Sequence, residues 1–201
     1  MHSGAGLTGR VCYRCTDPKK TPLVLVACGS FSPVTFLHLR MFEMARDHAR
    51  TETSFEVVGG YLSLVNDAYK KLGLAPSVHR YNMCRLACDK TSDWLMVDPF
   101  EARSKDYVPT APVLDHFDDE INKKRKGVAV VDEQGNEAGR KDVRIILLAG
   151  SDLIQTMSEP GVWAEQDVSR SLHSGFHSHS PAEAVLTLLV ALCVLPSSTT
   201  S

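Results

Sequence analysis

The sequence predicts an α/β fold in which helices flank a parallel sheet. Leu23–Cys28 is a short, continuously apolar run, which is the pattern of a strand buried on both faces of a parallel sheet. A glycine-containing turn and a helical pattern follow it directly, which is how a strand–helix–strand unit begins. Strand-like and helix-like segments then alternate along the chain, and this alternation favours a parallel sheet.

The other elements are predicted from the spacing of apolar residues. A helix from about Phe36 to Ala49 places Leu39, Phe42 and Ala45 on one face. Further strands are predicted at Phe55–Tyr61, Trp94–Val97, Val128–Val131 and Val143–Ala149, and further helices at Val78–Asp89 and, after Pro112, within Tyr107–Lys126. A polar loop containing Gly135, Asn136 and Gly139 is expected between the last two strands.

Length and composition fit one domain with a sizeable core. The 201 residues are 43% hydrophobic and carry a formal net charge of −2, so a general polyanion binder is excluded and no nucleic-acid partner is expected. The apolar run Val185–Leu195 is shorter than the roughly 20 residues that a membrane-spanning helix needs. The N-terminal residues lack the apolar stretch of a secretory signal, so no membrane partner is expected either.

The six cysteines have no regular spacing, which predicts reduced thiols and an intracellular protein. Cys12 and Cys15 form a Cys-x-x-Cys pair, but a lone pair without a second pair or nearby histidines is weak evidence for zinc. The histidines at His173, His177 and His179 are equally weak evidence. We therefore assign no metal ligand.

The segment Gly29–Arg40 is the feature that carries chemistry. Gly29 follows a buried strand directly, and a glycine there lets the backbone turn sharply and approach a phosphate. The N-terminus of the following helix favours an anion through its N–H groups and its dipole. Thr35 and His38 lie on one face of the first helical turn, where both can hydrogen-bond a phosphate. Because strand–glycine–helix turns are common, this spacing alone leaves nucleotide binding and an ordinary structural turn equally open.

Several motifs in order make the chain resemble the eukaryotic nicotinamide-mononucleotide (NMN) adenylyltransferases of the nucleotidyltransferase superfamily. The run Gly-Ser-Phe-Ser-Pro-Val-Thr-Phe-Leu-His-Leu-Arg at residues 29–40 is similar to their signature. Further similar segments are Asn66–Leu74, which resembles the family's lysine loop, His79-Arg80 with Met83, Val97–Glu101, Leu147–Leu153 and Pro160–Trp163. The resemblance covers about residues 22–167 and implies a Rossmann-like fold of the nucleotidyltransferase type.

The resemblance also implies an activity and a set of site residues. The family transfers AMP from ATP to NMN or to nicotinate mononucleotide (NaMN), which forms NAD or deamido-NAD and pyrophosphate in NAD biosynthesis, and Mg²⁺ enters with ATP. The catalytic residues it implies are His38, Ser30 and Lys71. The ATP-binding residues are Gly29, Ser30, Phe31, Thr35, His38, Gly150 and Asp152, and the mononucleotide-binding residues are Ser30, Phe31, Lys71, Tyr107, Thr110, Val162 and Trp163.

Some of these residues also have a plain structural interpretation. Trp163, which the resemblance would stack on the nicotinamide ring, is also a candidate for core packing. Asp152 is also a candidate helix N-cap, and Lys71 a solvated loop charge. Their order along the chain favours the functional interpretation over the structural one.

The C-terminal part departs from the family pattern. After Asp167 the family continues with more strands and an Ile-Ser-Ser-Thr-x-(Ile/Leu)-Arg motif that grips the ATP phosphates, and nothing similar follows here. We therefore expect a flexible N-terminal extension at residues 1–21, a C-terminally incomplete Rossmann-like domain at residues 22–167, and a divergent, poorly ordered tail at residues 168–201. An incomplete sheet favours aggregation or partner pairing, a homo-oligomer among the options. The absence of the phosphate-gripping motif is expected to weaken catalysis.

Three functions remain open on these grounds. They are an NMN/NaMN adenylyltransferase, impaired by the missing motif, a nucleotidyltransferase with another acceptor, and a catalytically inactive nucleotide-binding or interaction protein. The lysine loop and Pro160–Trp163 favour the first over the second, whereas the missing motif favours the third. We expect a location in the nucleus or cytoplasm, and Lys123–Lys126 is either a nuclear localisation signal or a charged helix end.

Overall fold

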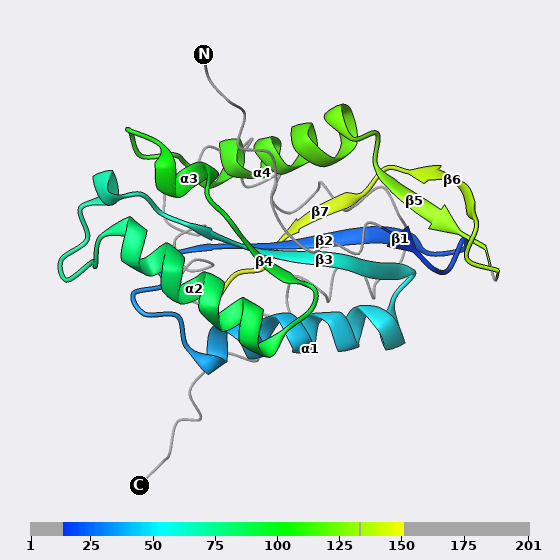
Figure 1. Ribbon diagram of the computed structural model, residues 1–201, viewed down its shortest axis with the longest axis horizontal. Coiled ribbons are helices and arrows are strands. Elements are labelled where there is room, and N and C mark those ends of the chain that lie inside the picture. Colours follow the sequence, from blue (N-terminus) through cyan, green and yellow to red (C-terminus); the bar gives the residue numbers. More distant parts are fainter. Residues whose placement is uncertain (1–13, 133, 151–201) are drawn as a thin grey trace, which may run out of the picture.

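The computed structural model describes residues 14–132 and 134–150, and Figure 1 shows their arrangement. The strands are β1 (Arg14–Cys15), β2 (Thr21–Gly29), β3 (Phe55–Leu64), β4 (Leu95–Asp98), β5 (Val128–Val131), β6 (Glu137–Lys141) and β7 (Arg144–Leu147). The helices are α1 (Phe36–Glu52), the 3₁₀ turn η1 (Asp67–Tyr69), α2 (Ser77–Thr91), α3 (Phe100–Arg103), α4 (Thr110–Asp118) and the π-helical segment η2 (Asp119–Lys124).

Four parallel strands form the main sheet in the order β4-β3-β2-β7, which confirms the predicted parallel α/β fold. The chain moves outward from β2 through β3 to β4 and then adds β7 on the other side of β2. The strand order therefore reverses between β2 and β7. In open parallel sheets a ligand binds in the crevice at such a reversal, beyond the carboxyl ends of the strands.

Helices cover both faces of this sheet, with α1 and α2 on one side and α4 on the other (Figure 1). Successive residues of β2 alternate between the two layers, because side chains of a strand point to opposite faces in turn. Leu23 and Leu25 pack with residues of α1 and α2, whereas Val24 and Val26 pack with residues of α4. This two-sided burial explains why the strand is apolar at every position.

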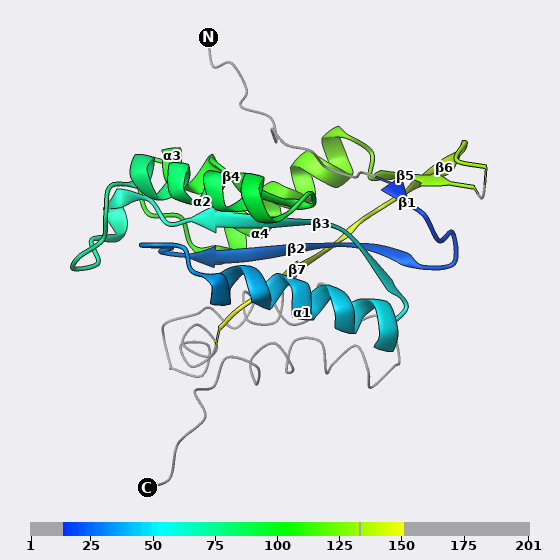
Figure 2. The same cartoon turned by 60° about the horizontal axis from the view of Figure 1, so that its bottom comes forward.

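A second, small sheet was not predicted, and it consists of β1, β5 and β6. It lies beyond one end of the main sheet in both views (Figure 1, Figure 2). The Glu56 carboxylate fixes the turn after β1, because it accepts hydrogen bonds from the backbone and side chain of Thr16 at 2.7–3.0 Å and from Asp17 N–H at 2.9 Å. Residues 14–21, which the sequence assigned to a flexible extension at residues 1–21, thus form β1, the turn after it and the first residue of β2.

The segment from Thr110 to Lys124 differs in detail from the predicted helix. The helix begins at Thr110, two residues before Pro112, because proline is tolerated in the first helical turn. From Asp119 the winding becomes π-helical, and Ile121 still reaches the core. Lys123 and Lys124 form ion pairs with Asp119 and Glu120, each four residues earlier, as expected of a charged helix end. No helix in the described residues is long and apolar enough to cross a bilayer.

Gly127 and Gly135 provide a test of the packing between η2 and the small sheet. Both have a positive φ, of 71° and 82°, but a Cβ atom at Gly127 would lie 2.0 Å from the Lys141 carbonyl oxygen, whereas one at Gly135 would meet no atom within 4 Å. We expect Gly135→Ala to lower the free energy of unfolding by about 1–2 kcal/mol through backbone strain. Gly127→Ala should cost about 1–3 kcal/mol more, because the overlap is with backbone. Urea unfolding of both variants measures this difference, and equal losses would contradict it.

Candidate active site

The turn after β2 is shaped by Gly29 and Phe31. The Gly29 carbonyl accepts a hydrogen bond from Val65 N–H at 3.0 Å, which joins the ends of β2 and β3. Phe31 adopts a left-handed backbone conformation with φ of 43° and is buried. A Cβ atom at Gly29 would come within 3.3 Å of the Phe31 ring, which is tighter than ordinary contact. Glycine at position 29 therefore lets the aromatic ring fold back over the end of the strand, and a non-glycine residue with positive φ marks a site of functional interest.

Hydrogen bonds at the N-terminus of α1 determine which ring nitrogen of neutral His38 carries the proton. Thr35 is the N-cap residue of the helix, and its backbone N–H donates to Nδ1 of His38 at 3.0 Å. The Thr35 hydroxyl lies 2.8 Å from the same nitrogen. Because Nδ1 accepts the backbone hydrogen bond, the neutral imidazole carries its proton on Nε2. The Phe31 ring packs edge-on against the imidazole, with 5.1 Å between the centroids.

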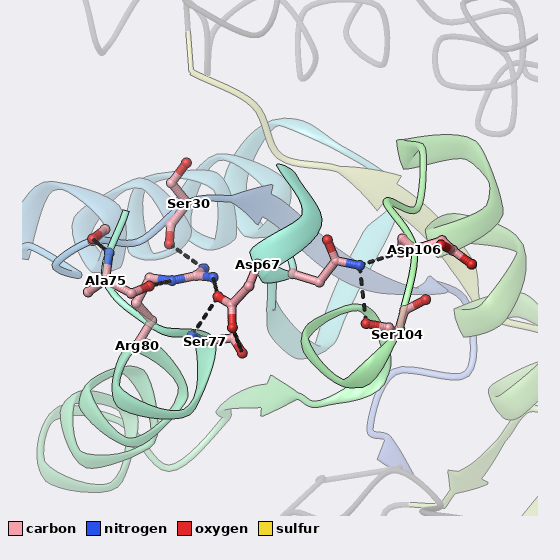
Figure 3. Close-up of polar contacts among 9 residues, drawn as sticks. Ser30, Asp67, Ala75, Ser77, Arg80, Ser104 and Asp106 are labelled. Atoms are coloured by element: carbon pink, nitrogen blue, oxygen red, sulfur yellow. Dashed lines mark hydrogen bonds and ion pairs between the residues drawn. The ribbon is translucent and has the colours of Figure 1, made fainter. Parts of the chain in front are cut away.

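A fully buried guanidinium, that of Arg80 on α2, connects this turn to the lysine loop (Figure 3). Arg80 donates from Nη1 to the Ser30 carbonyl at 2.9 Å, from Nε to the Ala75 carbonyl at 2.6 Å and from Nη2 to the Asp67 carboxylate at 3.1 Å. Asp67 also accepts two hydrogen bonds from Ser77, at 2.8 and 2.9 Å. Desolvation opposes ionisation of Asp67, but the Ser77 and Arg80 contacts outweigh it and lower the pKa of the carboxyl group.

Asn66, next to Asp67 and buried, holds the opposite side of the site. Its amide donates to the carbonyl groups of Ser104 and Asp106, which fixes the loop that leads into Tyr107. Tyr107 then stacks on Tyr69 of η1 with 5.5 Å between the ring centroids and 27° between the ring planes. Two neighbouring residues, Asn66 and Asp67, thus anchor both loops that flank the site.

These segments surround one cavity of about 650 Å³ at the carboxyl ends of the strands. The cavity is lined by nine of the residues predicted to form the site, which are Gly29, Ser30, Phe31, Thr35, His38, Lys71, Tyr107, Thr110 and Gly150. They come from segments up to 121 positions apart in the sequence, from Gly29 to Gly150. The other three, Asp152, Val162 and Trp163, lie outside the described residues, as does the tail at residues 168–201.

Beside the cavity lies a row of polar side chains that sequence reasoning did not assign, and one of them, Cys28, lines the cavity. Cys28, Ser63 and Asp98 are register partners across β2, β3 and β4, so their side chains lie on the same face of the sheet. Glu101 of α3 also lines the cavity, and it accepts a hydrogen bond from the Ser63 hydroxyl at 2.8 Å. Burial raises the pKa of the Glu101 carboxyl group to about 7, with Asp98 adding to the rise, while Ser63 and Arg80 oppose it.

Arg80 and Glu101 are two buried charged residues of the site that the sequence did not identify. Both stand inside motifs that resemble family segments, His79-Arg80 and Val97–Glu101, so the motifs were a signal for their location. Their burial was not foreseeable, because arginine and glutamate are mostly exposed in proteins. Phe100, the neighbour of Glu101, stacks on His116 with 3.9 Å between the ring centroids.

The arrangement suits a ligand with phosphate groups and an aromatic ring. A helix N-terminus with an imidazole N–H donor binds phosphate oxygens, and the ammonium group of Lys71 can add a mobile positive charge. The stacked tyrosines at the other flank offer flat apolar surfaces with polar tips. Burial raises the pKa of the Cys28 thiol well above its usual value, so this cysteine is not an activated nucleophile.

Comparison with known proteins identifies the family of this chain. A family profile described as Cytidylyltransferase-like matches residues 26–175. Nicotinamide/nicotinic acid mononucleotide adenylyltransferases 1 and 2 of Saccharomyces cerevisiae are 58% and 56% identical over 163 residues each, which is 81% of this chain but only 39% and 40% of theirs. A zebrafish (Danio rerio) protein with the name Nicotinamide/nicotinic acid mononucleotide adenylyltransferase 2 is 32% identical, over 76% of this chain and 70% of its own.

The chain thus spans about two fifths of the length of the yeast relatives. Its match with the family profile nevertheless includes the end of β2, the glycine turn and every described segment that lines the cavity. The chain therefore belongs to the Cytidylyltransferase-like family of nucleotidyltransferases, with eukaryotic nicotinamide/nicotinic acid mononucleotide adenylyltransferases as its relatives.

Proposed function

We propose that this chain carries the adenylyl-transfer site of an NMN/NaMN adenylyltransferase of NAD biosynthesis. The observation that supports the proposal is the single cavity in which the glycine turn, the α1 N-terminus, the lysine loop and the Tyr107 loop meet. The cavity has a phosphate-binding end and an aromatic end. These suit the phosphates at which a pyridine mononucleotide and ATP meet, and the pyridine ring of the mononucleotide. The names of the relatives point to the same two acceptors, the amide and the acid form.

The proposed reaction is a direct displacement at phosphorus. A phosphate oxygen of the mononucleotide attacks the α-phosphorus of ATP, a new P–O bond forms, and the bond to the bridging oxygen breaks as pyrophosphate leaves. No covalent intermediate on the protein is needed, so the chain contributes positioning and charge stabilisation. The Nε2–H of His38 would donate to phosphate oxygens that gain negative charge, and Lys71 would neutralise part of that charge.

Magnesium would enter as a complex with ATP. The cavity lining offers one carboxylate, that of Glu101, among the described residues, and no group of three or more metal-ligating side chains occurs in them. One carboxylate does not make a protein cage for a metal ion, so a Mg²⁺ ion would be held mainly by phosphate oxygens and water, which is its usual coordination beside nucleotides. The bound ion would neutralise phosphate charge. The roles of Asp152, Val162 and Trp163 stay predictions.

Replacing His38 tests the proposed phosphate contact. His38→Ala should lower the rate of NMN-dependent pyrophosphate formation from ATP about 100- to 1000-fold, because a hydrogen-bond donor to the developing charge is lost. His48→Ala is the matched control, since His48 lies on the same helix but does not line the cavity. Steady-state measurement of pyrophosphate with and without NMN gives the answer. A folded, purified chain that forms no pyrophosphate in response to NMN or NaMN would overturn the proposed function.

Two adjacent lysines provide a test of the lysine loop. Lys71 lines the cavity and Lys70 does not, although both belong to the same exposed turn. Lys71→Ala should raise the KM for the phosphate-bearing substrates about tenfold, because a hydrogen bond to a charged group contributes roughly 1.5–3 kcal/mol. Lys70→Ala should leave the KM within about twofold of the unchanged protein, as expected of a solvated surface charge. Equal effects of the two substitutions would show that Lys71 acts only through the general charge of the loop.

A further inference from the structure

Glu101 is the sole acidic side chain among the described residues that line the cavity. It is only 2% exposed, and Ser63 is the hydrogen-bond donor that reaches it in the described part of the chain. The one nearby guanidinium, that of Arg80, is engaged with Ser30, Ala75 and Asp67. The Glu101 carboxyl group is therefore buried in the cavity wall, and none of the residues that the structure describes forms an ion pair with it.

Glu101 belongs to the aromatic end of the cavity rather than to the phosphate end. Glu101 belongs to α3, which leads directly into the loop that carries Tyr107, and both residues line the cavity together with Tyr69, on which Tyr107 stacks. Burial raises the pKa of the Tyr107 hydroxyl, and Tyr69, Glu101 and Cys28 raise it further. The phosphate-binding groups Thr35 and His38 stand at the N-terminus of α1 instead. A pyridine mononucleotide that places its phosphate at this helix terminus would extend its ring toward Tyr107 and Glu101.

The ring of such a substrate has one substituent that can form hydrogen bonds. In the amide substrate this group is a carboxamide, whose NH₂ donates, and in the acid substrate it is a carboxylate, which only accepts. An ionised Glu101 accepts from the carboxamide but repels the carboxylate. A protonated Glu101 can donate its O–H to the carboxylate. The protonation state of Glu101 would thus determine how well the site discriminates between the amide and the acid substrate.

We propose, on the basis of the proposed function, that Glu101 is a specificity-determining residue that contacts the substituent of the pyridine ring. Its ionisation favours the amide substrate over the acid substrate. The residue touches the non-reacting end of the substrate, so it selects the acceptor without taking part in phosphoryl transfer. This role is separate from the phosphate contacts of His38 and Lys71.

The groups around Glu101 place its ionisation in the physiological range. The pKa of about 7 results first from burial and then from the balance of Ser63 on β3, Arg80 on α2 and Asp98 on β4. Asp98 is itself buried and lies 3.3 Å from Nε2 of His116 on α4, and the Cys28 thiol on β2 faces both carboxyl groups. Below this pKa the protonated form accommodates both substrates, and above it the ionised form repels the acid substrate.

The test measures binding rather than turnover. Isothermal titration of the whole chain with NMN and with NaMN, from about pH 5.5 to 8.5, gives the ratio of the two Kd values across the ionisation of Glu101. We expect the preference for NMN over NaMN to rise about tenfold over this range, because the ionised Glu101 carboxylate then repels the carboxylate of NaMN. Glu101→Gln should keep one preference at every pH, because the amide side chain does not ionise.

Two further substitutions test whether Glu101→Gln acts through the lost charge or only through a change in structure. Ser63→Ala removes the hydrogen bond that favours the ionised form, so the rise in preference should move to higher pH. Asp98→Asn removes a neighbouring negative charge, so the rise should move to lower pH. Circular dichroism of each variant establishes that it is folded before titration. If Glu101 had only a structural role, the two substitutions would not move the pH of the rise in opposite directions while both mononucleotides still bind.

The outcomes separate this inference from the proposed function. If both mononucleotides bind and their preference does not change with pH, or changes equally in Glu101→Gln, Glu101 does not select the substrate and the inference is overturned alone. If neither mononucleotide binds at any pH, the proposed function is overturned and the inference with it. A pH-dependent preference that Glu101→Gln removes and that Ser63→Ala and Asp98→Asn shift in opposite directions establishes it.

Discussion

The hydrogen bonds of the buried Arg80 guanidinium are the interaction on which the geometry of the site depends. They join the Ser30 carbonyl, the Ala75 carbonyl and the Asp67 carboxylate, which belong to the glycine turn and to both ends of the lysine loop. A planar fork of N–H donors satisfies all three acceptors at once, which the point charge of a lysine cannot do. Because a buried cation must be paired to be tolerated, these contacts also explain how an arginine can be fully enclosed here.

This arrangement connects the fold to the proposed chemistry. Parallel strands end at one edge of the sheet, and the strand order reverses beside β2, so the glycine turn opens into a crevice between two loops. Arg80 holds the lysine loop against that turn, and Asn66 holds the Tyr107 loop on the other flank. The proposed phosphate-binding end and the aromatic end of the cavity are therefore each held by a buried side chain, which suits the proposed mechanism of positioning.

The elements of the sheet were predictable from sequence where burial is two-sided or periodic. The apolar run of β2, the amphipathic spacing of α1 and the strand pattern before Gly150 all appear in the structure close to where the sequence placed them. The strands β1 and β6 were missed because they are short or polar: β6 reads Glu-Ala-Gly-Arg-Lys and is mostly exposed. Their pairing depends on β5 and on the Glu56 carboxylate, which are contacts distant in sequence.

The sequence by itself determined the kind of fold, and its local spacing also indicated the glycine turn with Thr35 and His38. The resemblance to the adenylyltransferases, carried by the order of the motifs, implied the other predicted residues that line the cavity. Only the tertiary structure decided which polar groups are buried. It placed Ser63 beside Asp98 through the register of β3 and β4, brought Glu101 over them and left its carboxyl group with a pKa of about 7. Desolvation depends on everything packed around a group, so a glutamate that reads as a surface charge in the sequence becomes, in the folded chain, a titratable residue of the cavity wall.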